Sequence, residues 1–168
     1  ATIRTACRTG PGWNITGCWR APSALPGRSM VFQSAAHVAD FLAQTQGNVL
    51  LATGAKELPA FAQLAPERLY PRVLPTLDGI AACEAAHIPH KNILALQGPF
   101  SYALNRALLE QFSIRFLVTK DGGAAGGFAE KAQAAADTGV QLIVIRRPAE
   151  TGETADQILT RCREVLKG

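Results

Sequence analysis

From Ser29 onward, short continuous apolar runs alternate with segments in which apolar residues recur at helical spacing. Continuous runs indicate strands that are buried on both sides, as in parallel sheets covered by helices. The pattern therefore predicts an α/β protein, a three-layer sandwich with a mostly parallel, flavodoxin-like or Rossmann-like sheet. The expected strands are Met30–Gln33, Asn48–Ala52, Arg68–Leu74, Asn92–Leu96, Ile114–Thr119 and Val140–Ile145.

The segments between these runs predict helices, and two of them begin at residues suited to capping. Ser34 and Ser101 can each accept a hydrogen bond from an N–H group of the first helical turn. Pro71 lies within the third apolar run and lacks an N–H group, so that strand is expected to be an edge or irregular strand. The expected helices run from Ser34 to about Thr45 and over Leu58–Leu64, Leu77–His87, Ser101–Gln111, Gly127–Asp137 and Thr154–Leu166.

The first 28 residues do not follow this alternation. Glycine and proline are concentrated in residues 8–17 and 21–27, as is typical of turns and linkers. Residues 1–28 are therefore expected to be a linker or the remnant of a preceding N-terminal half. The α/β domain is expected to occupy residues 29–168.

Composition and charge narrow the function classes. The formal charge is +4, and most of the 17 basic residues are Arg, scattered along the chain. This mild excess argues against a nucleic-acid partner and suits a small anionic ligand, because Arg pairs well with carboxylate and phosphate. Cys83 and Cys162 fall within helical patterns and no Cys-x-x-Cys pair is present, so free thiols are expected and a metal site is not. Reduced cysteines and the lack of a long apolar run favour a cytoplasmic protein that does not enter a membrane.

Candidate binding residues follow the ends of the expected strands. Ligands of parallel α/β sheets bind beyond the carboxyl ends of the strands, so the loops at that edge should converge on one site. These loops are rich in glycine, cations and side-chain donors, and they comprise Thr53–Glu57, Arg72–Pro75, Gln97–Ser101, Lys120–Gly127 and Arg146–Pro148. The sequence therefore predicts a binding site at this edge of the sheet.

Several features of these loops admit two interpretations. The glycine run Gly122–Gly127 is either an anion cradle at a helix N-terminus or a flexible surface turn. Gln97–Ser101 either contacts a ligand or is a plain connection between a strand and a helix. Lys120 closes a buried strand, where a purely structural lysine is uncommon, and it could neutralise an anion or deliver a proton. Other cations of this edge either grip an anionic ligand or are simply solvated; they include Lys56, Arg72 and Arg147.

A specific combination of segments appears in one order and spacing along the chain. The segments are Leu51–Leu58, Arg72–Pro75, Leu96–Ser101, Leu117–Gly123, Gly126-Gly127, Glu130-Lys131 and Val144–Pro148. Together they resemble the precorrin-6A reductase (cobalt-precorrin-6A reductase) family. The similarity covers nearly everything from about Arg20 to the end of the chain.

The resemblance implies an NADPH-dependent oxidoreductase of cobalamin biosynthesis. Its substrate would be the precorrin-6A or cobalt-precorrin-6A macrocycle, an anionic tetrapyrrole, and Lys120 would stabilise the reacting macrocycle or deliver a proton. The residues expected to bind the cofactor NADPH are Thr53, Gly54, Gln97, Gly98, Pro99, Phe100, Gly122 and Gly123. The residues expected to bind the substrate are Lys56, Arg72, Ser101, Lys120, Gly126, Gly127 and Arg147.

The sequence departs from the family at its beginning. The family normally starts with another α/β half that carries a Gly-Gly-Thr type nucleotide loop, and Thr2–Cys7 look like the last helix of that half. Activity is therefore expected to be complete only with such a half, and association with other corrin-pathway enzymes is a further expectation. The alternatives are a non-catalytic α/β module that binds an anionic tetrapyrrole or nucleotide, and a flavodoxin-like signalling or scaffold domain.

Overall fold

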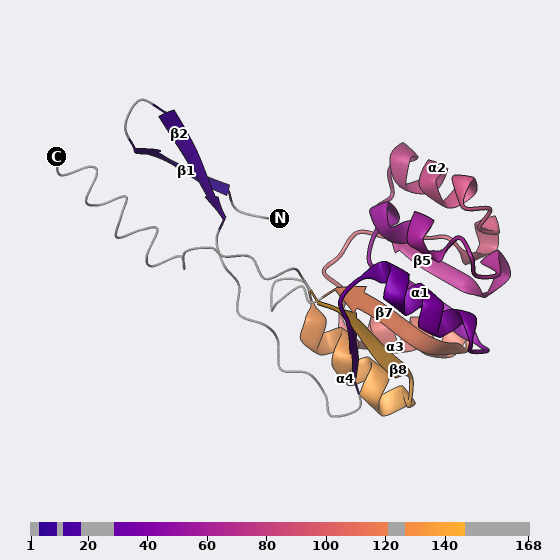
Figure 1. Cartoon of the computed structure of the whole chain (residues 1–168). Helices are drawn as coiled ribbons and strands as arrows, with labels where there is room; N and C mark the ends of the chain where they lie inside the picture. The colour runs from indigo at the N-terminus through magenta and orange to yellow at the C-terminus, as the bar shows by residue number, and fades with distance from the viewer. Residues whose placement is uncertain (1–3, 10–11, 18–28, 121–126, 147–168) are drawn as a thin grey trace. The chain divides into compact units, whose positions relative to one another are not determined.

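The structure is a computed structural model, and the residues that it describes are 4–9, 12–17, 29–120 and 127–146 (Figure 1). The chain divides into two compact units. One unit combines residues 1–22 with residues 148–168, and the other spans residues 23–147. The second unit holds the sheet and the helices that position the candidate site.

A two-stranded antiparallel hairpin lies in the first unit, where β1 spans Arg4–Thr9 and β2 spans Gly12–Gly17. Thr9 of β1 is paired with Gly12 of β2. The expectation that Thr2–Cys7 forms a helix is therefore wrong wherever the structure describes this segment. Both strands carry β-branched residues, which favour extended backbone, and the strands satisfy each other's N–H and C=O groups.

The second unit contains six strands, which are β3 (Met30–Phe32), β4 (Asn48–Ala52), β5 (Leu69–Val73), β6 (Leu94–Ala95), β7 (Ile114–Lys120) and β8 (Gln141–Ile145). They form one sheet in the order β3-β8-β7-β4-β5-β6, and every neighbouring pair is parallel. The predicted α/β class with a parallel sheet is confirmed. The chain runs outward from β4 to β6 and then returns to place β7 on the other side of β4. Order switches of this kind are where parallel sheets commonly bind ligands.

The connecting helices are α1 (Ala35–Ala43), η1 (Ala55–Phe61), η2 (Pro66–Arg68), α2 (Leu77–Ala85), η3 (His90–Asn92), α3 (Tyr102–Gln111) and α4 (Phe128–Thr138), where η marks a 3-10 helix. The two predicted caps are confirmed, because Ser34 Oγ accepts from the His37 N–H at 3.3 Å and Ser101 Oγ accepts from the Leu104 N–H at 3.2 Å. None of the helices in the described ranges is both long and apolar enough to cross a membrane. The helix expected over Thr154–Leu166 lies outside these ranges.

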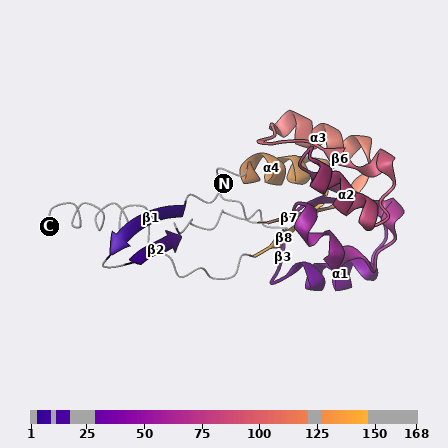
Figure 2. The ribbon, with the colours of Figure 1, turned by 90° about the horizontal axis from the view of Figure 1, so that it is seen from above.

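The sheet carries a separate core on each face. On what we call the first face, Val49 and Leu51 of β4 pack with residues of α1, η1 and α2. On the second face, Leu50 of β4 and Leu117 of β7 pack with residues of α3 and α4. Because alternate strand residues point to opposite sides, one apolar run fills both cores. Figure 2 shows α1 on the opposite side of the strands from α3 and α4, which confirms the predicted three layers.

Two connections differ from the sequence prediction for local reasons. The helix expected over Leu58–Leu64 is instead the 3-10 helix η1, which contains Pro59, a residue without the N–H group that an α-helix needs. The fourth strand is shorter than expected because Asn92 lies in η3. Its buried side chain donates to the carbonyls of Glu67 at 2.8 Å and Leu69 at 3.2 Å. The side chain of Asn92 thereby replaces part of a strand at the edge of β5.

Pro71 occupies β5, which is not the edge strand because β6 lies beyond it. β6 nevertheless pairs only with the last two residues of β5. The Val73 carbonyl accepts from the Leu96 N–H at 2.9 Å, and the Leu69 carbonyl accepts from Asn92. The backbone groups of the odd-numbered residues of β5 therefore point toward β6. The backbone nitrogen of Pro71 also points toward β6, but Pro71 comes before the first residue of β5 that pairs with β6. The missing N–H group of Pro71 therefore leaves no hydrogen bond between the two strands unmade.

Candidate functional site

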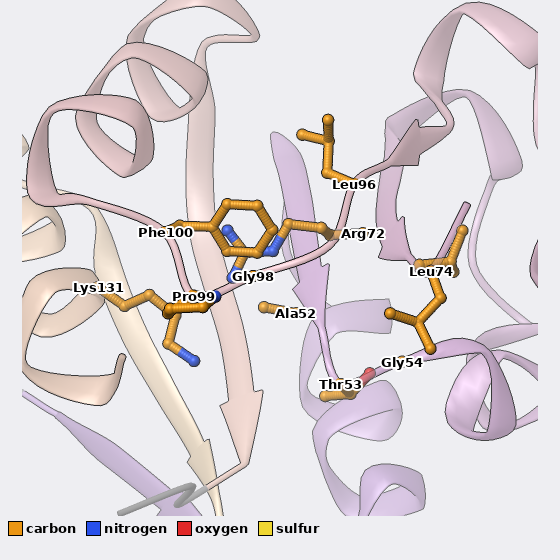
Figure 3. A pocket seen from close by; sticks show the side chains of 11 residues that line it. Ala52, Thr53, Gly54, Arg72, Leu74, Leu96, Gly98, Pro99, Phe100 and Lys131 are labelled. Atoms are coloured by element: carbon orange, nitrogen blue, oxygen red, sulfur yellow. The ribbon is translucent and has the colours of Figure 1, made fainter. Parts of the chain in front are cut away.

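A cleft of about 370 Å³ opens at the carboxyl ends of β4, β5 and β6 (Figure 3). Its lining is drawn from the ends of these strands, from the loop after β6 and from α4; the residues are Ala52, Thr53, Gly54, Arg72, Val73, Leu74, Leu96, Gly98, Pro99, Phe100 and Lys131. The volume falls within the range of small-molecule sites. The cleft therefore lies at the edge of the sheet where the sequence predicts binding.

Arg72 is buried at the end of β5, on the second face of the sheet. Its Nη1 donates to Asn105 Oδ1 at 3.0 Å, and its guanidinium carbon lies 4.2 Å from the centre of the Phe100 ring. A planar cation over an aromatic face is a favourable arrangement that also fixes the side chain. Burial lowers the pKa of Arg72 to about 10, so the side chain remains charged at neutral pH.

Lys131 is the second buried cation of the cleft, and it comes from the first turns of α4. Its Nζ donates to Thr119 Oγ1 at 3.2 Å. Burial and then the charge of Arg72 lower the pKa of Lys131 to about 8, against a smaller opposite effect of Glu130. Among the described residues, neither Lys131 nor Arg72 forms an ion pair with a carboxylate. The cleft thus contains two positive charges that are poorly solvated because Arg72 and Lys131 are buried.

The end of β4 supplies an unpartnered hydroxyl and an unusual backbone position. Thr53 Oγ1 is buried and has no hydrogen-bond partner within the described residues. Gly54 has a φ of 87°, which favours glycine, and no atom lies within 4 Å of where a Cβ would be. This stretch therefore offers a polar side chain and an accessible backbone to the cleft.

The loop after β6 is held against Arg72 by the start of α3. Asn105 is buried, and its Nδ2 donates to the carbonyls of Ser101 at 2.8 Å and Phe100 at 3.3 Å. The Gly98–Pro99 peptide bond is cis. A Cβ on Gly98 would lie 3.0 Å from Phe100 Cε2, so glycine lets the ring fold back over its own loop. Asn105 therefore joins this loop, Arg72 and α3 in one buried network.

Gly127 connects the loop after β7 with this network. It caps α4 with a φ of 60°, and a Cβ at this position would lie 3.8 Å from the Phe100 carbonyl oxygen. The left-handed backbone explains why glycine stands there. Gly127 therefore supports the cleft from behind Phe100 but does not line it.

The structure brings together only part of the predicted site. Six predicted residues line the cleft: Thr53, Gly54, Arg72, Gly98, Pro99 and Phe100. Five described residues do not line it, and they are Lys56, Gln97, Ser101, Lys120 and Gly127. Lys120 Nζ instead forms an ion pair with Glu57 Oε1 at 2.5 Å, which gives it a structural role in addition to the predicted chemical one. Gly122, Gly123, Gly126 and Arg147 lie outside the described residues.

Lys131 and Asn105 are site residues that the sequence analysis did not select. A signal for Lys131 was nevertheless present, because it follows Phe128 by three residues and precedes Ala135 by four. This spacing places the lysine on the apolar stripe of its helix, where a solvated charge would not be expected. A charged residue that lies on the buried stripe of a helix, close to a candidate loop, is therefore itself a candidate site residue.

Among the described residues, no cysteine or histidine lines the cleft. Cys83 is a free thiol in the core of the first face, as predicted, and burial raises its pKa. His90 Nε2 lies 3.0 Å from Glu84 Oε1 at the surface. Within the described ranges, no group of three or more His, Cys, Asp or Glu side chains is placed to hold a metal ion. Cys162 lies outside these ranges.

Proteins of related sequence are described as cobalt-precorrin-6A reductases or precorrin-6A reductases. The chain is 39% identical over 121 residues to the cobalt-precorrin-6A reductase of Priestia megaterium, covering 70% of this chain and 46% of that protein. It is 41% identical over 112 residues to the enzyme of the same name from Salmonella typhimurium, covering 66% of this chain and 42% of that protein. The precorrin-6A reductase of Rhodococcus erythropolis is 32% identical over 126 residues, or 73% and 48% of the two chains. The chain thus spans less than half the length of these relatives.

A solved structure and a family model agree with these relatives. The structure of CobK precorrin-6A reductase superposes with a TM-score of 0.69 at 24% identity, covering 88% of this chain and 60% of that chain, and shows that the fold is shared. The model of the family described as precorrin-6x reductase CbiJ/CobK matches residues 14–166. This match covers most of the chain and includes the six-stranded sheet, the cleft and both buried cations. The chain therefore belongs to the precorrin-6x reductase CbiJ/CobK family.

Proposed function

We propose that this chain is part of an NADPH-dependent reductase that acts on the precorrin-6A or cobalt-precorrin-6A macrocycle in cobalamin biosynthesis. A second α/β half of the kind that the family resemblance implies would complete the active site. The observation that carries the proposal is the cleft at the carboxyl edge of the sheet, with Arg72 and Lys131 buried in it, in a chain of this family.

The lining suits an amphiphilic, anionic ligand. Leu74 is 56% exposed and Leu96 is 37% exposed, and both lie at the cleft, where they offer apolar surface to a macrocycle or a nucleotide ring. Arg72 and Lys131 offer positive charge to carboxylates or phosphates. The macrocycle combines a flat conjugated body with peripheral carboxylates, so both parts of the lining have a counterpart in it.

The residues at the end of β4 fit a role in holding the cofactor. Thr53 Oγ1 is a buried donor without a partner in the described residues, and space is open beside Gly54. Both features suit the approach of a phosphate or ribose oxygen. Bound NADPH would supply the hydride. The chain would orient the two reactants, exclude water from the cleft and hold the charges of the ligand.

The experiment is an NADPH oxidation assay on the full-length protein that contains this chain. We expect loss of NADPH absorbance only when precorrin-6A or its cobalt form is present, with a product heavier by two hydrogens. Binding of the tetrapyrrole without NADPH oxidation would refute the reductase and support the non-catalytic binding module.

Arg72→Met and Arg115→Met form a matched pair for this assay, because each removes one arginine and only Arg72 lies in the cleft. We expect kcat/KM to fall by about tenfold or more in Arg72→Met, the size of a lost hydrogen bond to a charged group. Arg115 is exposed on β7, so its variant should retain normal activity. Equal activity of the two folded variants would place the reaction away from this cleft.

A further inference from the structure

Resting on the proposed function, we propose that Asn105 is a positioning residue, which directs Arg72 toward an anionic ligand without neutralising its charge. The same side chain holds the loop that follows β6. Asn105 lies in the first turn of α3, with only 2% of its surface exposed, and it does not line the cleft. It would therefore act through its neighbours and not by touching a ligand.

The three hydrogen bonds of the Asn105 side chain fix the direction of its amide. Asn105 Oδ1 accepts from Arg72 Nη1 at 3.0 Å. Asn105 Nδ2 donates to the Ser101 carbonyl at 2.8 Å and to the Phe100 carbonyl at 3.3 Å. A guanidinium can only donate and a carbonyl oxygen can only accept, so the reversed amide would present the wrong group to each neighbour. The amide therefore joins the cation and the loop in one orientation.

Aspartate and leucine have nearly the shape of asparagine, yet neither could do what Asn105 does. A carboxylate would neutralise Arg72 and would face the two carbonyl oxygens without a donor. Leucine would leave the guanidinium and both carbonyls without a partner at this position. Of the three side chains, only the amide accepts from a cation, donates to carbonyls and adds no charge. An asparagine at this position thus leaves the charge of Arg72 available to a ligand.

Arg72 is held on a second side by the loop that Asn105 fixes. Its guanidinium carbon lies 4.2 Å from the centre of the Phe100 ring, and Figure 3 shows the two side chains next to each other. Because the Phe100 carbonyl is bonded to Asn105, a change at Asn105 would loosen the ring as well as the guanidinium. Within the described ranges, no carboxylate forms an ion pair with Arg72. The direction of this cation is therefore set by an amide and a ring, and not by an acidic partner.

Asn92 is a matched control, because it is a second buried asparagine that donates to two carbonyls. Only 1% of its surface is exposed, and its Nδ2 donates to the Glu67 carbonyl at 2.8 Å and to the Leu69 carbonyl at 3.2 Å. Asn92 does not line the cleft. The Arg72 side chain is bonded to Asn105 and not to Asn92. A role of Asn105 that was only structural would be matched by equal changes at Asn92.

Binding to the full chain is measured with two anionic probes, one for each source of negative charge in the proposed reaction. Uroporphyrin, a carboxylate-rich tetrapyrrole, represents the macrocycle, and inorganic pyrophosphate represents the phosphates of the dinucleotide. Fluorescence titration follows the porphyrin, and calorimetry follows pyrophosphate. Urea denaturation of the same samples measures stability, so a loss of affinity can be separated from a loss of folded protein.

Two replacements of Asn105 test the two parts of the proposal. Asn105→Asp should weaken one of the two probes by about tenfold or more, because a carboxylate beside Arg72 replaces the charge that the probe would use. Asn105→Leu adds no charge and should weaken the same probe by a smaller factor, since it only releases the guanidinium and the loop. Asn92→Asp and Asn92→Leu should bind both probes as the wild-type chain does.

A double-mutant cycle shows whether Asn105 acts through Arg72. Arg72→Met removes the cation, so Asn105→Leu should cause no further loss of probe affinity when it is added to Arg72→Met. A residue that supported the cleft only as part of the core would weaken binding by the same factor in both backgrounds. If either replacement prevents folding, Asn105→Ser, whose hydroxyl is too short to make all three bonds, takes its place in the cycle.

The proposal is overturned if neither probe binds the folded wild-type chain, or if Asn105→Asp binds both probes as tightly as Asn92→Asp. It is also overturned if Asn105→Leu weakens binding equally with and without Arg72. These assays involve no turnover. A chain in which Asn105 and Arg72 are coupled, but which never oxidises NADPH, would refute the reductase and leave the positioning role intact. A reductase without this coupling would do the reverse.

Discussion

The two faces of the sheet are covered by helices in the same way, yet they differ in what they bury. The first face is closed by α1, η1 and α2 over an apolar core. The second face, under α3 and α4, also buries four polar or charged residues near the carboxyl ends of the strands: Arg72, Asn105, Thr119 and Lys131. The difference indicates that the first face serves stability, whereas the second gives up stability to hold charge beside a cleft.

The strongest test of this contrast is a cavity in the first face. Phe61 of η1 is fully buried there, so Phe61→Ala should lower the free energy of unfolding by about 3 to 5 kcal/mol. Probe binding by the remaining folded protein should not change, because Phe61 does not line the cleft. Urea denaturation and titration of the same sample measure the two effects. If the affinity for the probes fell together with the stability, the two faces of the sheet would not serve stability and binding separately.

Two buried asparagines sharpen the comparison. Asn105→Ala leaves Arg72 and two carbonyls without their partner and should cost about 1 to 3 kcal/mol. Asn92→Ala removes a similar pair of bonds to carbonyls away from the cleft and should cost about as much. Only Asn105→Ala should also weaken the binding of uroporphyrin or pyrophosphate, because only Asn105 orients Arg72. Equal binding by the two variants would remove the proposed positioning role of Asn105.

Lys131→Met should instead raise the free energy of unfolding, by about 1 kcal/mol at pH 7. The pKa of Lys131 is lowered from 10.5 to about 8, so the folded protein bears the full cost of the charged amine below pH 8. Between these two pH values the folded chain binds fewer protons than the unfolded chain, and wild-type stability rises. The advantage of the variant should therefore disappear as pH approaches 10. Thr119 keeps its bond to the Lys120 carbonyl, so no hydroxyl is left unpaired. Thermal melts at pH 7 and pH 10 check this; a variant less stable at both would contradict it.

Lys120→Ala should have the smallest effect on stability. Its ion pair with Glu57 is partly exposed, and such pairs contribute about 1 kcal/mol or less. The family resemblance implies that Lys120 stabilises the reacting macrocycle or delivers a proton, so turnover of the full-length enzyme should fall more than stability. Melting and steady-state kinetics on one variant test both statements. Unchanged turnover would confine the site to the cleft and leave Lys120 as a structural residue.

The sequence predicts the strands of the six-stranded sheet because their signal is local. Continuous apolar runs such as Val49–Leu51 indicate a buried strand without knowledge of its neighbours. The position of six cleft residues also follows from topology, since loops after parallel strands meet at one edge. Thr53, Arg72 and Phe100 were found in this way although they are distant in sequence.

The remaining features depend on partners that a linear pattern does not reveal. Whether Lys120 enters the cleft depends on Glu57, which lies 63 residues away and binds it elsewhere. The prediction omits Lys131 because it rests on the loops after the strands and Lys131 lies inside a helix, although its spacing from Phe128 indicates burial. The hairpin of β1 and β2 was mistaken for helix and linker, since its strands are stabilised by each other and not by an apolar core signal.

The titration of the Lys131 amine by NMR tests the central claim most directly. The signal can be assigned with Lys131→Arg and followed against pH with and without pyrophosphate or uroporphyrin. The account predicts a pKa of about 8 in the free chain and a higher value when the preferred anion is bound, because binding and protonation favour each other. A value near the ordinary lysine pKa of 10.5 that neither anion moves would contradict it.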